Sequence, residues 1–203
     1  MKRKGFKLLP LILSLSMITA IMLSGSAFAL SSDSAVSSED VIYKTVSAMD
    51  SHDWEAYVTL QCKENKADYE TFLGNKDNEG KQLGLFNIIS AKVFEIKELP
   101  LEKITAFTKI NEYQKNYENV AAYYVGIDYA VHEESQYYFN GVNYNLVLVG
   151  QEKGQWKIVE MSDAPVESFV SMGLSFGSKE EAKALKIIEV RISGTIIGSE
   201  CGR

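Results

Sequence analysis

Apolar residues recur at helical spacing between Ser37 and Leu60. Ser37 and, three residues later, Asp40 match a capping box, and the apolar positions that follow are Val41, Ile42, Thr45, Val46 and Met49. The pattern breaks at residues 50–53. Asp53 can cap a second short helix, whose apolar side carries Trp54, Ala56, Tyr57 and Leu60. The sequence therefore predicts two consecutive helices.

The next segment predicts a shorter helix followed by a loop. A helix over Lys66–Leu73 would place its apolar residues on one face. Gly74 stands where a left-handed C-cap is common. The polar stretch Asn75–Gln82 predicts a surface loop.

From Phe86 onward the pattern becomes typical of strands. Ile88–Leu99 is rich in β-branched and aromatic residues and ends before Pro100, whereas Leu101–Lys109 predicts a short helix or a loop. Three apolar runs follow at about 119–132, 137–149 and 155–162, and the Gly-flanked segment Gly150–Gly154 joins the last two as a hairpin. Helices, then a strand, then a meander predict an α+β fold, with N-terminal helices on a curved, mainly antiparallel sheet.

Alternation along the strands predicts one apolar face. The odd-numbered residues from Ala121 to Val131 are expected in the core, with the even-numbered residues on the other face. Asn143 and Asn145 are also expected away from the core. In the last two runs the expected core residues are Val142, Tyr144, Leu146, Leu148, Trp156 and Ile158. The glycines expected to mark bends or bulges are Gly126 and Gly141.

Residues 164–203 are expected to follow the domain as a linker and a C-terminal helix. Ser178 and Glu181 match another capping box. The expected inward positions of this helix are Ala182, Leu185, Ile188 and Val190. Two alternatives are open for the segment: a linker to a further domain, and a helix that docks on the sheet.

The first 29 residues are typical of a secretory signal peptide. Four basic residues precede the apolar stretch Leu8–Leu23, and Ala27 and Ala29 are the small residues that a signal peptidase requires. Cleavage after Ala29 would leave a secreted or cell-envelope protein, with a Ser-rich leader at 30–37 before a domain at 38–163. The alternative is an uncleaved membrane anchor, which Pro10 and the hydroxyl residues of the stretch disfavour.

The exported chain would be acidic. Because the four charged residues of the signal peptide are all basic, its removal changes the formal net charge from −6 to −10 and leaves 174 residues. That length suffices for one domain with a core. An acidic surface repels phosphate, so no nucleic-acid partner is expected, and membrane contact is expected only through the signal segment.

Few residues match a catalytic or metal site. Asp128 and His132 share the predicted non-core face, roughly 13 Å apart along the strand, which is too far for a direct hydrogen bond. His52 lies between two aspartates, but helix capping is the stronger explanation for these residue types at a helix break. Two histidines and two scattered cysteines cannot easily supply a zinc site, so neither a metal nor another cofactor is predicted.

The cysteines and tyrosines suggest packing rather than chemistry. Cys62 and Cys201 are 139 positions apart, and Cys62 is expected as a partly buried small residue rather than a disulfide partner or a nucleophile. Most of the 11 tyrosines are expected in the core. The alternative is that Tyr124, Tyr137 or Tyr138 stacks on a sugar or a partner protein. These three, Asp128 and His132 are the candidate interaction residues, and no catalytic residue is assigned.

Two resemblances to known families follow from these motifs. The Asp-Trp-Glu-Ala-Tyr run at Asp53–Tyr57, the bent sheet and the last strand from Gly154 to Val159 resemble the NTF2-like (cystatin-like), cone-shaped α+β domain over residues 38–163. Tyr137–Tyr144 and Ser162–Val166 resemble the N-terminal module of exported Gram-positive proteins in which a SpoIID/LytB-type domain, associated with peptidoglycan processing, follows. The NTF2-like resemblance implies a pocket between sheet and helices, in a fold that hosts isomerases, dehydratases and ligand-free interaction modules.

These observations favour a secreted, non-catalytic binding or positioning module at the cell envelope, as the accessory part of a truncated peptidoglycan-processing protein. Its expected partner is cell-wall glycan or an envelope protein. One alternative is an isomerase- or hydrolase-type enzyme with an internal pocket, which requires an ionisable residue among the inward positions. Another is a structural module that forms homodimers through the outward sheet face.

Overall fold

The structure of the protein, a computed structural model, describes residues 37–135 and 137–187. These residues form an α+β arrangement of helices and a four-stranded antiparallel sheet. The predicted signal peptide lies outside them. Within the described ranges, no helix is long and apolar enough to cross a membrane.

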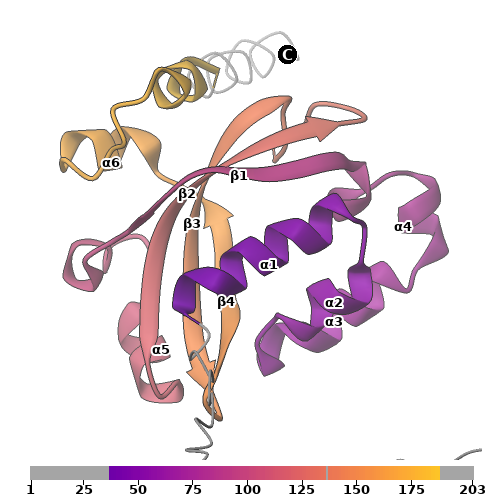
Figure 1. The fold of residues 1–203 in the computed structure, drawn as a ribbon, viewed down its shortest axis with the longest axis horizontal. Coiled ribbons are helices and arrows are strands. Elements are labelled where there is room, and N and C mark those ends of the chain that lie inside the picture. Colours follow the sequence, from indigo (N-terminus) through magenta and orange to yellow (C-terminus); the bar gives the residue numbers. More distant parts are fainter. Residues whose placement is uncertain (1–36, 136, 188–203) are drawn as a thin grey trace, which may run out of the picture. The chain divides into compact units, whose positions relative to one another are not determined.

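Four helices precede the first strand of the sheet, so helices and strands are largely separate along the chain (Figure 1). Two short 3₁₀ turns, Gly84–Asn87 and Leu101–Lys103, flank the first strand. The helices are α1 (Ser38–Asp50), α2 (Trp54–Thr59), α3 (Lys63–Leu73), α4 (Lys76–Gly80), α5 (Ile110–Asn116) and α6 (Val166–Ser171). The strands are β1 (Ile88–Glu98), β2 (Val120–Val131), β3 (Gly141–Glu152) and β4 (Gln155–Asp163).

The capping residues of α1 and α2 are those predicted. The Ser37 hydroxyl accepts a hydrogen bond from the Asp40 N–H at 3.1 Å, and the Ser37 N–H donates to the Asp40 carboxylate at 3.0 Å. Asp53 accepts from the Ala56 N–H at 2.9 Å. These side chains satisfy N–H groups that have no partner within a helix. The predicted capping box and the predicted cap of α2 are confirmed.

The segment after α2 differs from its prediction. α3 begins at Lys63, three residues earlier than expected, and Gly74 ends it with right-handed backbone at φ −75°, so the left-handed cap is wrong. The Asn75 side chain accepts from the Asp77 N–H at 3.0 Å and begins α4 inside the predicted loop. No residue of α4 is buried, so an apolar pattern could not reveal it.

The sheet is a meander in the order β1-β2-β3-β4, and every neighbouring pair is antiparallel. The β3–β4 hairpin turns at Lys153 and Gly154, whose φ angles of 50° and 77° are the positive values that such a two-residue turn requires. β3 begins at Gly141, so residues 137–140, predicted in this strand, lie before it.

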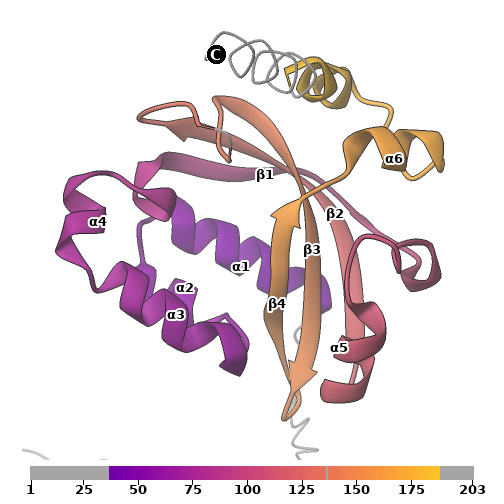
Figure 2. The ribbon, with the colours of Figure 1, turned by 180° about the vertical axis from the view of Figure 1, so that it is seen from behind.

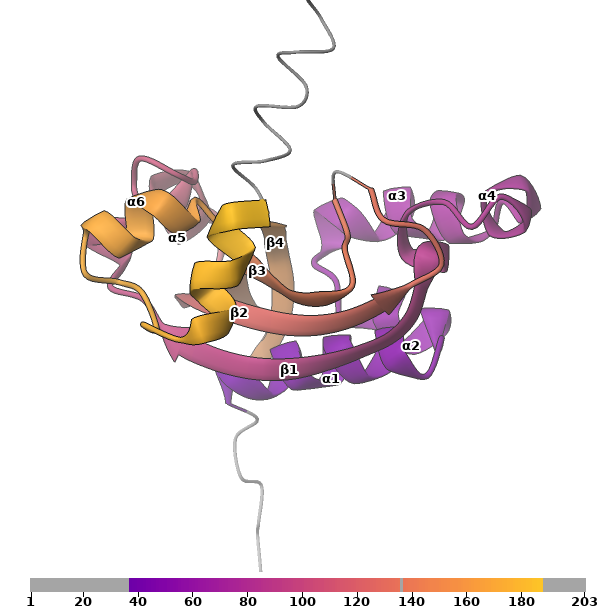
Figure 3. The ribbon, with the colours of Figure 1, turned by 90° about the horizontal axis from the view of Figure 1, so that it is seen from above.

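β1 and β2 curve together (Figure 3). Their register shifts between Val93 and Glu95, opposite Gly126. A Cβ on Gly126 would lie 3.0 Å from the Tyr144 ring and 3.1 Å from the Glu95 side chain, so glycine permits this close packing. The irregularity predicted at Gly126 is therefore present. The extra residue of this bulge belongs to β1, between Val93 and Glu95, and not to β2.

Both faces of the sheet are buried, and the prediction of one apolar face is wrong. The inner face carries odd-numbered residues of β2 and β3 and packs against α1 and α2. The outer face carries the even-numbered residues, of which Tyr124 and Leu148 are fully buried. Residues of the inner core include Val41, Met49, Tyr57, Ala121, Val125, Val147 and Ile158. Residues of the outer core include Ile104, Ile110, Tyr124, Leu146, Phe169, Leu174 and Ala184.

The register explains this correction. Tyr124 pairs with Leu146, and Val125 pairs with Asn145. Directly paired residues of neighbouring strands share a face. The four residues of β3 that were predicted in the core with Ala121 therefore lie on the outer face, and Asn143 and Asn145 lie on the inner face. The residues concerned are Val142, Tyr144, Leu146 and Leu148.

The outer face is covered by segments that follow β4. α6 and a helix over residues 179–187 pack there, and this gold helix and α1 lie on opposite sides of β1 (Figures 1 and 2). Ala184 is buried whereas Ala182 is exposed, so the predicted inward position of Ala182 is wrong. Ile188 and Val190 lie outside the described residues. The described part of this helix docks on the sheet.

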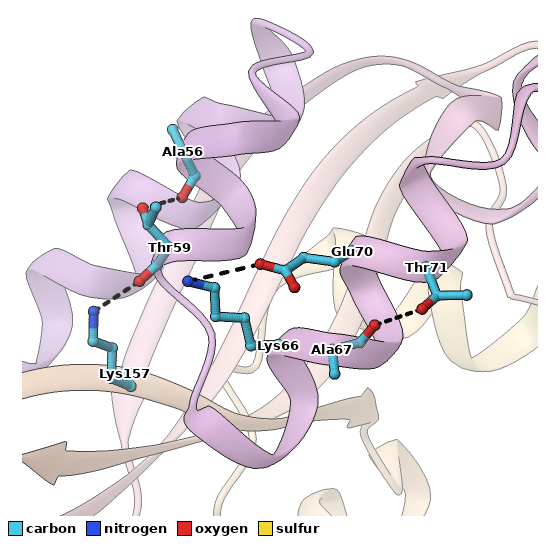
Figure 4. A network of polar contacts seen from close by, with 7 residues as sticks. All are labelled: Ala56, Thr59, Lys66, Ala67, Glu70, Thr71 and Lys157. Atoms are coloured by element: carbon cyan, nitrogen blue, oxygen red, sulfur yellow. Dashed lines mark hydrogen bonds and ion pairs between the residues drawn. The ribbon is translucent and has the colours of Figure 1, made fainter.

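A lysine joins β4 to the end of α2 (Figure 4). The Lys157 ammonium donates to the Thr59 carbonyl at 2.7 Å, and the Thr59 hydroxyl donates to the Ala56 carbonyl at 2.8 Å. A cation at a helix C-terminus also complements the helix dipole. On α3, Lys66 and Glu70 form an ion pair at 3.7 Å, one turn apart. The charges of these two lysines are therefore matched by groups on the helices.

Candidate functional site

A pocket of about 510 Å³ opens between the helices and the inner face. Small-molecule sites commonly have volumes of roughly 300–1,000 Å³. The pocket combines residues of α1, α2 and α3, the 3₁₀ turn before β1, three strands and the loop that follows β2. The residues that line it are Met49, Tyr57, Tyr69, Phe72, Gly84, Leu85, Tyr129, Tyr137, Tyr138, Asn145, Met161, Ser162 and Asp163.

Aromatic rings form much of this wall. Tyr57 and Tyr69 meet edge to face with ring centroids 5.2 Å apart, and Tyr129 and Tyr138 do so at 5.4 Å. Burial raises the pKa of Tyr57 and of Tyr129, and burial, with smaller effects of Tyr69 and Asp163, raises the pKa of Tyr138 to about 12. At neutral pH these hydroxyls keep their protons and act as uncharged hydrogen-bonding groups.

One part of the wall is polar. Asn145 of β3 and Asp163 of β4 are cross-strand partners, and Ser162 is next to Asp163. Asn145 is 9% exposed. Burial by the surrounding protein raises the pKa of the Asp163 carboxyl, although the residue keeps access to solvent. Within ranges 37–135 and 137–187, no donor or cation is paired with this carboxylate.

The pocket contains one ionisable group that is charged at neutral pH. Of the described residues that line it, Asp163 is the sole carboxylate, and none is Lys, Arg, His or Cys. A lone carboxylate can accept hydrogen bonds, pair with a cation or take up a proton. Acid–base catalysis also needs a proton donor matched to the working pH, and the buried tyrosines hold their protons too strongly for that. The arrangement favours binding.

High pH is expected to weaken the fold through the pocket tyrosines. The pKa of Tyr138 is about 12 in the native state against 10.0 ordinarily, so the native state binds more protons between these values. The free energy of unfolding therefore falls as pH rises through this window. We expect a lower urea midpoint at about pH 11 than at about pH 9, and a smaller difference for Tyr138→Phe. The neighbouring exposed Tyr137→Phe is the control, and an unchanged pH dependence in Tyr138→Phe would contradict the assignment.

The structure separates the five candidate interaction residues. Tyr137, 63% exposed, and the partly buried Tyr138 both line the pocket. Tyr124 is fully buried in the outer core, where its hydroxyl donates to Glu181 at 2.8 Å. A ligand cannot stack on a ring with no accessible surface, so the predicted surface role of Tyr124 is wrong.

Asp128 and His132 are exposed and lie outside this pocket. The His132 backbone N–H donates to the Asn87 carbonyl at 2.9 Å, which aligns the end of β2 with the turn before β1. The structure therefore does not bring these two candidates together with Tyr137 and Tyr138.

Sequence reasoning missed Asn145 and Asp163. Strict alternation from Ile158 would place residues 160 and 162 inward. The register of β3 and β4 instead shifts between Leu148 and Val149. Met161 then pairs with Val147 and Asp163 with Asn145, on the inner face. The available signal was a polar residue, Asp163, at the end of the apolar strand β4. The register shift that directs its side chain inward has no distinctive sequence.

His52 and its neighbouring aspartates have structural partners. The His52 Nε2 lies 2.9 Å from the Ile88 carbonyl, and its ring stacks on Trp54 with centroids 5.5 Å apart. Asp50 accepts from the Ala91 N–H at 3.0 Å, while Asp53 caps α2. The predicted capping role is confirmed for Asp53, whereas His52 and Asp50 bond to the backbone of β1.

A second group of metal-ligand types lies at the start of α3. Ligand atoms of Cys62, Glu64 and Glu152 lie within 4.8 Å of one another. Both carboxylates already accept hydrogen bonds, from the Tyr117 hydroxyl at 2.9 Å and the Lys63 N–H at 3.2 Å. Burial raises the pKa of the Cys62 thiol, which keeps it protonated. These contacts explain the group as packing.

Cys62 is 1% exposed, so it is buried more completely than the partial burial expected of it. Cys201 lies outside the described residues. The predicted absence of a bridge between them stays a prediction.

Comparison of the chain with known protein families, with curated proteins and with solved structures found no match.

Proposed function

We propose that this protein is an exported, non-catalytic binding module whose ligand occupies the pocket between the helices and the inner face. The observation that carries this proposal is the pocket itself, about 510 Å³ in volume, with aromatic walls and a polar part. An apolar pocket with a few convergent polar groups is the usual location of a small-molecule ligand. Export to the cell envelope rests on the first 29 residues.

An NTF2-like relationship is part of the proposal. It is supported by the order of the elements, with α1 to α3 before a four-stranded meander, and by a pocket between these helices and the sheet. The relationship to proteins with a SpoIID/LytB-type domain, and a role beside cell-wall glycan or an envelope protein, rest on sequence resemblance. The fold alone would permit either binding or catalysis.

The contents of the pocket favour binding over catalysis. An isomerase- or hydrolase-type enzyme needs an inward ionisable residue, and Asp163 meets that requirement. It has no second acid–base partner among the described lining residues with a pKa near neutrality. The homodimer alternative requires a free outer sheet face, whereas α6 and residues 179–187 cover that face in this structure. Binding is therefore the function that the geometry supports best.

Met161→Trp is expected to weaken the binding of a small apolar probe. Met161 is a partly buried residue of β4 that lines the pocket and packs on the inner core. An indole there would occupy space that the ligand needs. We expect the affinity for naphthylmethanol to fall by at least roughly tenfold, because the probe can no longer bury its apolar surface. NMR titration of the labelled protein would measure the affinity and identify the residues that move.

The matched control is Met172→Trp, because Met172 follows α6, is 37% exposed and lies outside the pocket. This variant should bind the probe as the original protein does. A correctly folded Met161→Trp variant with undiminished affinity, or shifts that map elsewhere on the protein, would contradict the proposed function.

A further inference from the structure

The charge distribution around the pocket points to the chemical class of its ligand. The Asp163 carboxylate has no cationic partner within the described residues, and the lining contains no Lys, Arg or His. Lys157 donates to the end of α2 and Lys66 pairs with Glu70, so the contacts of these two lysines lie away from Asp163. A solvent-accessible carboxylate at the pocket wall without a counter-ion attracts a positively charged ligand.

The aromatic wall fits the same ligand class. The ring faces of tyrosine carry partial negative charge and attract cations within about 6 Å, most strongly where water is excluded. Tyr129 and Tyr138, which meet edge to face, line the pocket together with Asp163, and Asp163 is close enough to each to raise its pKa. Tyr57 and Tyr69 provide a second edge-to-face pair in the wall. The tyrosine rings and the Asp163 carboxylate thus both favour a positively charged ligand.

We propose that the pocket binds an organic cation, an amine or quaternary ammonium with an apolar body, whose charged end pairs with the Asp163 carboxylate while its body packs against the tyrosine rings. This inference rests on the proposed binding function. Asn145, the cross-strand partner of Asp163, can accept a further hydrogen bond from an ammonium N–H through its amide oxygen. An anionic ligand would meet the unpaired Asp163 carboxylate and no cation among the described lining residues, in a chain of net charge −6.

The test compares three probes that share a ring and differ in charge: naphthylmethylamine as the cation, naphthylmethanol as the neutral form and naphthoate as the anion, substituted at the same position. Isothermal titration calorimetry at neutral pH would measure each affinity. A hydrogen bond to a charged group corresponds to roughly tenfold in affinity at the lower end of its range. We expect the amine to bind about tenfold more tightly than the alcohol, and the naphthoate to bind most weakly.

Asp163→Asn is expected to lower the affinity for the amine about tenfold, which removes its preference over the alcohol. The matched control is Asp128→Asn, an exposed aspartate outside the pocket, which should keep the preference. Thermal unfolding of both variants would verify that they are folded.

The outcomes separate the two proposals. If none of the three probes binds, the proposed binding function fails. If the alcohol binds as tightly as the amine, or if Asp163→Asn keeps the preference for the amine, the cation inference is overturned while ligand binding in the pocket stands.

Discussion

Phe169→Ala is expected to lower the free energy of unfolding by about 3–5 kcal/mol, the cost typical of emptying a phenylalanine site in a core. Phe169 belongs to α6 and is 0% exposed. Its ring meets Tyr124 edge to face at 5.0 Å and Phe107 at 5.6 Å. The substitution would remove both contacts and leave a cavity under the outer face of the sheet. Urea unfolding followed by circular dichroism would measure the effect.

Val170→Ala is the matched control, because Val170 is the next residue of the same helix and is 45% exposed. We expect it to change the free energy of unfolding by no more than about 0.5 kcal/mol, as surface substitutions usually do. If Phe169→Ala were equally mild, α6 would contribute little to the domain, and the outer face would be available to a partner. The homodimer alternative would then regain support.

The sequence predicted the inner half of the fold well, because local rules determine it. Capping side chains act on their own helix, so Ser37 and Asp53 could be assigned without any tertiary contact. The four strands and the β3–β4 hairpin followed from β-branched runs and from Gly154. Helix caps and strand or turn composition both depend only on residues that are close together in the sequence.

The outer half depended on register, which is a long-range property. β3 is apolar at nearly every position from Tyr144 to Val149, so alternation could not distinguish its faces. Pairing with β2 resolves the ambiguity and places Asn145 on the inner face. The same uncertainty concealed the pocket: Asn145 and Asp163 become neighbours only through the shifted register of β3 and β4. A one-residue slip moves a side chain to the other face.

The C-terminal segment shows how a polar residue can fix a helix on an apolar face. Glu181, 3% exposed, accepts hydrogen bonds from the Tyr124 hydroxyl at 2.8 Å and from the Gly177 N–H at 2.8 Å. The Ser178 hydroxyl accepts from the Glu181 N–H at 3.1 Å and donates to Glu95 of β1 at 2.8 Å. The capping box predicted from Ser178 and Glu181 is therefore half formed. The Glu181 carboxylate does not bond to the Ser178 backbone N–H but to the Tyr124 hydroxyl of β2. This hydrogen bond joins the helix at 179–187 to the outer face of the sheet.

Glu181→Gln is accordingly expected to destabilise the protein by about 2–3 kcal/mol, although it preserves shape. The amide has one oxygen, so its NH₂ group must face either the Tyr124 hydroxyl or the Gly177 N–H, and one buried donor loses its acceptor. Hydrogen exchange should be faster at the amides of residues 179–187, and urea unfolding would give the free-energy change. Glu180→Gln, one position earlier and more exposed, should leave both unchanged. Equal exchange rates in the two variants would show that the buried carboxylate does not hold this helix on the sheet, and that its apolar residues alone suffice.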